Sequence, residues 1–87
     1  MILPRYTAKF IRMYKGLEPT LKEEVMEKIS LFQDEKNHSL LKVHKLHGGF
    51  KNYYSFSINY QIRIIFKYEN KNTVNLLYIG DHDELYR

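Results

Sequence analysis

The chain contains no cysteine, and this absence excludes several kinds of protein. Without thiols it can form neither a disulfide framework nor a thiolate zinc site, so a reducing cytoplasm is the expected location. Long apolar runs are also missing. The first residues do not resemble a secretory signal, and no later segment approaches the roughly 20 apolar residues that span a bilayer. We therefore expect a cytoplasmic protein without a membrane anchor.

Acidic residues are missing from one long stretch. The net charge is +4, yet no aspartate or glutamate lies between Glu35 and Glu69. The cationic and histidine residues in this stretch are Lys36, His38, Lys42, His44, Lys45, His47, Lys51, Arg63 and Lys67. On a sheet they would create a positive surface suited to a polyanion, although a basic surface kept for solubility explains the charge equally well. Interleaved aromatic residues favour RNA, because rings stack on unpaired bases, but in a small sheet most aromatics belong to the core.

Two helices are predicted in the first half of the chain. Residues 3–6 resemble a short strand, and Thr7 is a suitable N-cap for a helix over 8–15. Pro19 marks the start of a second helix, in which apolar residues recur at helical spacing until about Asn37. His38, in the polar loop that follows, is expected at the surface.

From Leu40 onward the hydrophobic period changes to two, which is typical of strands. We expect strands over 41–46, 53–58, 61–68 and 73–79. In the third of these, Arg63 points away from the apolar face formed by Ile62, Ile64 and Phe66. The predicted fold class is α+β: two N-terminal helices packed on one face of a four-stranded, mainly antiparallel sheet, with a short N-terminal strand. At 87 residues the chain, 1–87, has room for one domain, and Arg63 points into the open face of its sheet.

Two residues are the first candidates for chemistry. We expect Gly80 to turn the backbone after the last strand and to present His82, whose imidazole titrates near neutrality and can transfer protons. Arg63 lies between apolar neighbours, so its charge needs a partner. That partner is either a phosphate, which the guanidinium fork binds with two hydrogen bonds, or a carboxylate. The candidate carboxylates are Asp81, Asp83 and Glu84.

Cleavage of RNA without a metal needs a base for the 2′-hydroxyl, an acid for the leaving 5′-oxygen and a cation for the charge on phosphorus. His82, Arg63 and either His44 or His47 supply these types. A zinc site is not expected, because His44 and His47 point to opposite faces of a strand and no acidic residue is close in sequence.

Four segments of the chain, in this order, resemble the RelE/ParE superfamily of type II toxin–antitoxin toxins. They are KVHKLHG at 42–48, YSFSI at 54–58, RIIF at 63–66 and GDHDELY at 80–86. Together with the short strand and two helices before them, the likeness covers essentially the whole chain. It implies a RelE-like microbial RNase fold and a single RelE/ParE-like toxin domain.

Within the superfamily, the motifs are most similar to the ribosome-dependent mRNA interferases of the RelE and YafQ kind. The resemblance implies that Arg63 stabilises phosphate charge, that His82 acts in proton transfer, and that His44 is a second histidine of the site. We assign His82 as the general acid and His44 as the base. It also places Tyr86 at a C-terminal aromatic position, where the ring would stack on or orient a base. The expected RNA-binding residues are Lys42, Lys45, His47, Lys51 and Lys67.

The same resemblance implies partners. These are the ribosome, mRNA and a cognate antitoxin whose acidic segment competes for the positive face. No metal or small-molecule cofactor is expected. Two alternatives stay open: a ParE-like inhibitor of DNA gyrase, and a non-toxic remnant of the family.

Overall fold

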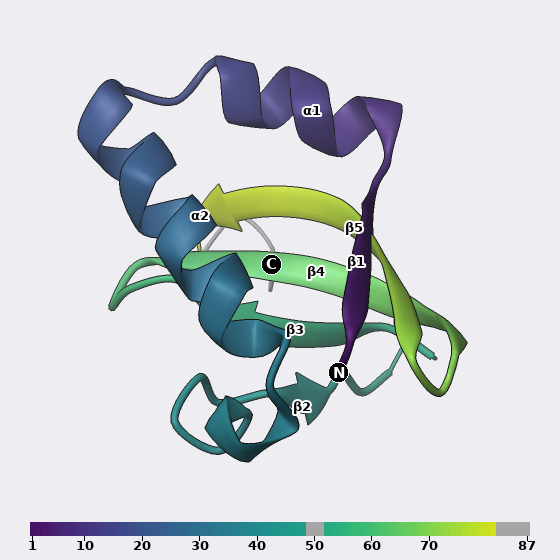
Figure 1. The fold of residues 1–87 in the computed structure, drawn as a ribbon. Helices are drawn as coiled ribbons and strands as arrows, with labels where there is room; N and C mark the ends of the chain where they lie inside the picture. Colours follow the sequence, from purple (N-terminus) through teal and green to yellow (C-terminus); the bar gives the residue numbers. More distant parts are fainter. Residues whose placement is uncertain (49–51, 82–87) are drawn as a thin grey trace.

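The computed structural model describes residues 1–48 and 52–81, which form two helices and a five-stranded mixed sheet (Figure 1). In chain order the elements are β1 (Leu3–Tyr6), α1 (Ala8–Lys15), α2 (Pro19–Phe32), the 3₁₀ turn η1 (Glu35–Asn37), β2 (His44–Lys45), β3 (Tyr54–Ser57), β4 (Ile62–Asn70) and β5 (Thr73–Asp81). The strand order is β1-β5-β4-β3-β2. The predicted α+β class is confirmed, and the short N-terminal strand adds to the sheet as a fifth strand, parallel to β5.

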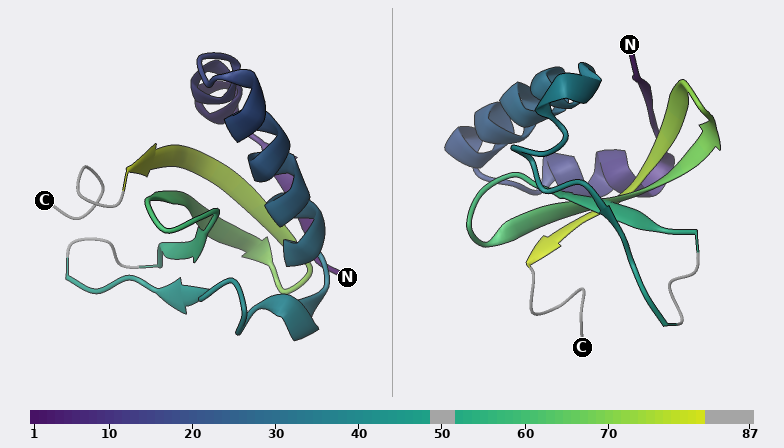
Figure 2. Two further views of the ribbon diagram at one scale, coloured as in Figure 1. Left: turned by 90° about the vertical axis from the view of Figure 1, so that its left-hand side faces the viewer. Right: turned by 90° about the horizontal axis from the view of Figure 1, so that it is seen from below.

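Both helices cover the same face of the sheet, and the two further views show them together on one side of it (Figure 2). The core fills the space between these layers. Four phenylalanines dominate it: Phe10 and Phe32 from the helices, and Phe56 and Phe66 from β3 and β4, each at most 1% exposed. Phe32 stacks on Phe56 at 4.3 Å between ring centroids. No helix of residues 1–48 and 52–81 covers the opposite side of the sheet, here called the open face.

Thr7 joins α1 to the sheet. Its side-chain oxygen accepts a hydrogen bond from the Phe10 N–H at 3.2 Å, as the predicted N-cap requires. The same hydroxyl donates to the carbonyl of Leu76 on β5 at 2.7 Å. One threonine therefore sets both where α1 begins and where it lies against β5.

The second helix begins at Pro19, as predicted, but it ends at Phe32 and not near Asn37. Local side-chain hydrogen bonds replace the helical ones: Asp34 caps η1, and the Asn37 amide donates to the Leu31 carbonyl at 2.9 Å. The prediction of a surface His38 is also wrong, because its ring stacks on Phe32 at 4.7 Å and lies half-buried. Neither helix in the described part of the chain is long and apolar enough to cross a membrane.

The strands differ from the prediction at their ends. The strand expected over 41–46 is reduced to His44 and Lys45, because Lys42 has a φ of 57° and turns the chain just before it. The last strand, expected over 73–79, continues to Asp81. Gly80 is therefore not a turn after the strand, as predicted, but a member of the ladder opposite Arg63.

Candidate functional site

The strand register arranges the open face in rows. One row runs across β3, β4 and β5 through Ser57, Arg63 and Gly80. The next row runs from β2 to β5 and is formed by His44, Ser55, Ile65 and Tyr78. Directly paired residues in a sheet share a face, so these rows bring together residues from four strands.

Arg63 is the centre of its row, and the prediction that it lies on the open face is confirmed. Gly80 beside it brings no side chain, which leaves room for the guanidinium. The Arg63 Nε and Nη1 atoms are buried and have no hydrogen-bond partner within residues 1–48 and 52–81. A buried donor without a partner costs about 1–3 kcal/mol, and more when it is charged.

The alternative of an ion pair between Arg63 and Asp81 has no support in the register. Asp81 pairs with Ile62, whose side chain packs against the core, on the opposite side of the ladder from Arg63. Its carboxylate accepts a hydrogen bond from the Gln61 amide at 2.5 Å. The other two candidate carboxylates, Asp83 and Glu84, lie outside the described residues.

His44 lies exposed on β2, on the same face as Arg63. The register places the two residues two strands apart and in neighbouring rows, about 10 Å across the sheet and about 7 Å along it. The His44 Nδ1 atom is 2.8 Å from the carbonyl oxygen of Lys42. Because a carbonyl only accepts, Nδ1 must donate, and in the neutral ring this leaves Nε2 with its lone pair free to accept a proton.

The expected RNA-binding residues do not all lie on one face. Lys67 lies on β4, two residues beyond Ile65, so it shares the open face. Lys45 pairs with Tyr54 and therefore projects to the other side of the ladder from His44, although it is exposed at the sheet edge. Lys42 precedes β2 in the chain and His47 follows it, and both side chains are exposed. Strand alternation thus separates residues that the sequence brings close together.

Three predicted site residues, His82, Tyr86 and Lys51, lie outside the described residues. Their assignments rest on the sequence and its resemblance to toxins.

The open face also contains an apolar hollow of about 290 Å³, which the sequence analysis missed. Its lining comes from four parts of the chain: Thr7, Lys9, Tyr53, Ile65, Leu77 and Tyr78. Lys9 donates from Nζ to the Tyr78 hydroxyl at 2.7 Å, although the two residues are 69 positions apart. Strand alternation in the sequence already placed Ile65 on the open face together with Arg63. No local pattern in the sequence indicates that Lys9 also reaches this hollow.

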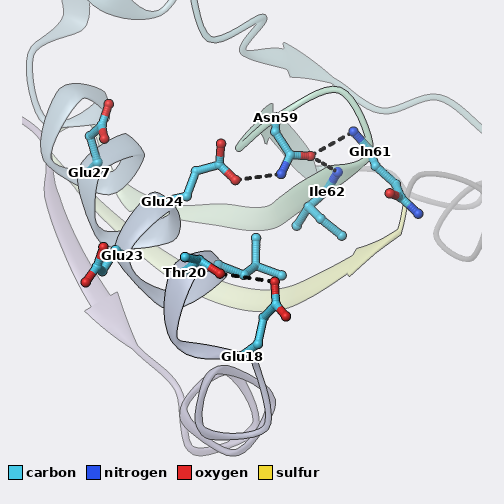
Figure 3. Close-up of a pocket in the computed structure, with 9 residues that line it drawn as sticks. Glu18, Thr20, Glu23, Glu24, Glu27, Asn59, Gln61 and Ile62 are labelled. Carbon is cyan, nitrogen blue, oxygen red and sulfur yellow. Dashed lines mark hydrogen bonds between the residues drawn. The ribbon is translucent and has the colours of Figure 1, made fainter.

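Acidic side chains line a second hollow, of about 550 Å³, between α2 and the connection from β3 to β4 (Figure 3). Its acidic residues are Glu18, Glu23, Glu24 and Glu27. Asn59 donates from its amide to Glu24 at 2.7 Å and accepts from the backbone N–H groups of Gln61 and Ile62, both at 2.8 Å. These contacts fix the connection into β4. In the described part of the chain, no group of three or more His, Asp or Glu side chains is placed to hold a metal.

Comparison with solved structures gives the same fold. Over 100% of both chains, YafQ from E. coli superposes with a TM-score of 0.78 at 15% identity. The toxin–antitoxin complex RelBE2 from Mycobacterium tuberculosis matches with a TM-score of 0.74 at 20% identity, over 93% of this chain and 98% of that one. The YoeB–YefM complex from Staphylococcus aureus matches with a TM-score of 0.68 at 18% identity, over 94% and 98%.

A sequence comparison with curated proteins gave no match. The comparison with protein families did: residues 12–82 match the family described as RelE-like toxin of type II toxin–antitoxin system HigB. This match covers most of the chain, including α2, β4 and β5. The chain therefore belongs to the RelE-like HigB toxin family of type II toxin–antitoxin systems.

Proposed function

We propose that this toxin is an endoribonuclease that cleaves mRNA in the ribosomal A site. The observation that carries the proposal is the Arg63 guanidinium, which is half-buried on the open face with two donor atoms that lack a partner within the described residues. A phosphate accepts from both edges of such a fork and carries the opposite charge. No acidic residue lies between Glu35 and Glu69, so β2, β3 and most of β4 offer a surface that does not repel RNA.

The proposed reaction is attack of a 2′-oxygen on the adjacent phosphorus. His44 accepts the 2′-hydroxyl proton on Nε2, the atom left free when Nδ1 donates to the Lys42 carbonyl. The bond from phosphorus to the 5′-oxygen breaks, and His82 donates a proton to that oxygen as general acid. Arg63 stabilises the negative charge that develops on the phosphoryl oxygens. The products are a cyclic 2′,3′-phosphate and a free 5′-hydroxyl.

The remaining assigned residues bind and orient the strand. Lys42, Lys45, His47, Lys51 and Lys67 are proposed to contact phosphates, and Tyr86 to stack on or orient a base. The exposed Lys42 and His47, which precede and follow β2, support a path of the RNA along this edge of the sheet.

A cognate antitoxin is the proposed protein partner, and the proposed location is the cytoplasm. Related toxins have been solved as the DinJ–YafQ and YoeB–YefM complexes. An acidic segment of the antitoxin would compete with RNA for the positive face.

Induced expression in bacteria, followed by sequencing of mRNA 5′ ends, tests the proposal. Wild type should arrest growth and produce new 5′ ends within translated codons, whereas Arg63→Ala should lose both effects. Arg63→Lys keeps the charge without the fork and should retain only part of the activity. Arg12→Ala, at an exposed position in α1, is the matched control and should act as wild type.

Other outcomes would contradict the nuclease. Growth arrest with intact mRNA and inhibited DNA supercoiling would identify a gyrase inhibitor. Absence of growth arrest by a folded wild-type protein would identify a non-toxic remnant.

A further inference from the structure

The apolar hollow on the open face, lined by Tyr53, Ile65, Tyr78 and their neighbours, is not used by the proposed reaction. We propose that it binds one unpaired base of the RNA strand whose phosphate Arg63 holds. This inference rests on the function proposed above and names a subsite of the same surface. A volume of about 290 Å³ lies at the small end of ligand pockets, which suits one base.

Each of the two tyrosines that line the hollow has a cation beside it. Lys9 Nζ lies 4.0 Å from the centroid of the Tyr78 ring, and Lys67 Nζ lies 5.1 Å from that of Tyr53. Sites for single-stranded nucleic acid combine aromatic rings, on which bases stack, with cations that bind the backbone. The hollow has both components, because Lys9 of α1 is part of its lining and Lys67 of β4 lies beside its Tyr53.

The position of Lys9 is not explained by the stability of α1. It is the second residue of the helix after the Thr7 N-cap, where the helix dipole favours an anion and disfavours a cation. The first turn of α1 has no acidic residue to compensate. The side chain instead reaches the hollow, where it donates to the Tyr78 hydroxyl and lies over the Tyr78 ring. Its positive charge there would attract an anion such as a phosphate.

The hollow lies next to the proposed phosphate site on the same face of β4. Ile65 lines it and lies two residues from Arg63 on the same face of β4, about 7 Å along the strand. No acidic residue is among its lining. A base in the hollow would therefore belong to a nucleotide next to the phosphate at Arg63. In this position it would influence which bonds are cleaved.

Binding of short RNA to the full-length toxin, measured by fluorescence anisotropy, tests the subsite. The RNA carries 2′-O-methyl groups, which prevent attack by the 2′-oxygen, and single positions are made abasic in turn. In wild type, one abasic position should weaken binding on the order of tenfold, the effect of one stacked base. Tyr78→Leu should lose a similar factor and should no longer respond to that abasic position. Tyr78→Phe keeps the ring and should retain the response.

Two further variants, one control and one second test, complete the experiment. Tyr60→Leu, in the connection from β3 to β4, removes a fully exposed tyrosine away from the hollow and should bind as wild type. Lys9→Met changes an exposed side chain, so it gives a second test should Tyr78→Leu fail to fold, and it should weaken binding several-fold.

The outcomes separate this inference from the proposed function. Equal RNA affinities for Tyr78→Leu, Lys9→Met and Tyr60→Leu, together with cleavage in cells by wild type, would overturn the subsite and leave the nuclease standing. The subsite is also overturned if Tyr78→Leu loses binding of the antitoxin but not of RNA, because the hollow would then be a protein-docking surface. Base-dependent RNA binding without cleavage in cells would support the subsite and contradict the nuclease.

Discussion

At the scale of single residues, Arg63 combines a stability cost with the central role in the proposed function. Two of its donor atoms are buried without a partner in the part of the chain that the structure describes, so the folded protein gains little from them. Sites of function commonly retain such groups at the expense of stability. A residue that served the fold alone would be expected to have a partner.

We therefore predict that Arg63→Met abolishes growth inhibition without destabilising the protein. The free energy of unfolding, measured with urea, should stay unchanged or rise by about 1–2 kcal/mol, because an apolar side chain replaces unpaired donors. Arg12→Met, at an exposed position, should change it by less than about 0.5 kcal/mol. A loss of more than 1 kcal/mol in Arg63→Met would show that the guanidinium is structural.

Tyr68 allows a prediction about pH. Burial raises the pKa of its phenol, and the nearby Tyr54 and Glu35 raise it further. The folded state thus favours the neutral phenol, so its contribution to stability is complete below the unfolded pKa of about 10 and is lost as pH rises through the higher folded pKa. Urea unfolding at increasing pH should show falling stability above about pH 10, with a smaller decline in Tyr68→Phe. A decline of wild-type size in Tyr68→Phe, or one reduced equally in the exposed Tyr60→Phe, would contradict this.

At the scale of elements, the placement of α1 depends on Thr7. The same hydroxyl caps the helix and bonds to Leu76 of β5, so it aligns α1 with the sheet and places Lys9 at the apolar hollow. This dual contact explains how a helix of eight residues is held in one orientation.

Thr7→Ala should lower the free energy of unfolding by about 1–2 kcal/mol, because both the cap and the bond to β5 are lost. Thr20→Ala is the matched control. Its hydroxyl donates to the exposed Glu18 at 3.2 Å, so we expect a change below about 0.5 kcal/mol in urea denaturation. Similar losses in the two variants would mean that the Thr7 contacts contribute little.

At the scale of the whole molecule, charge is segregated. Four glutamates line the hollow between α2 and the β3–β4 connection, whereas the rows of the open face from β2 to β5 bring Arg63, His44 and Lys67 to one surface. Such an arrangement orients a polyanion toward the open face before any contact forms.

This segregation predicts a salt dependence. Each phosphate contact of a single strand contributes about 0.7 to the slope of log affinity against log salt concentration. In anisotropy titrations with uncleavable RNA, Lys67→Gln should reduce the magnitude of the slope by about that amount. Glu23→Gln, at an exposed position in the acidic hollow, should leave it unchanged. An unchanged slope in Lys67→Gln would exclude a phosphate contact at this lysine.

The sequence by itself determined the features that depend on local periodicity. The helix starts at Thr7 and Pro19, the change to a period of two near Leu40, and the open-face position of Arg63 all follow from short-range patterns, because side chains alternate regularly along a strand. Helix and strand ends were less predictable. Local hydrogen bonds at Asp34 and Asn37 ended α2 early, against its apolar pattern.

Only the tertiary structure decided which distant residues meet. The parallel pairing of β1 with β5, the place of Gly80 beside Arg63 and the contact of Lys9 with Tyr78 join positions far apart in the chain. No local pattern encodes these contacts, because strand register depends on which combination of distant surfaces buries the most apolar area. The sequence thus supplied the candidate residues, and the fold decided that Arg63, His44 and the apolar hollow share one face.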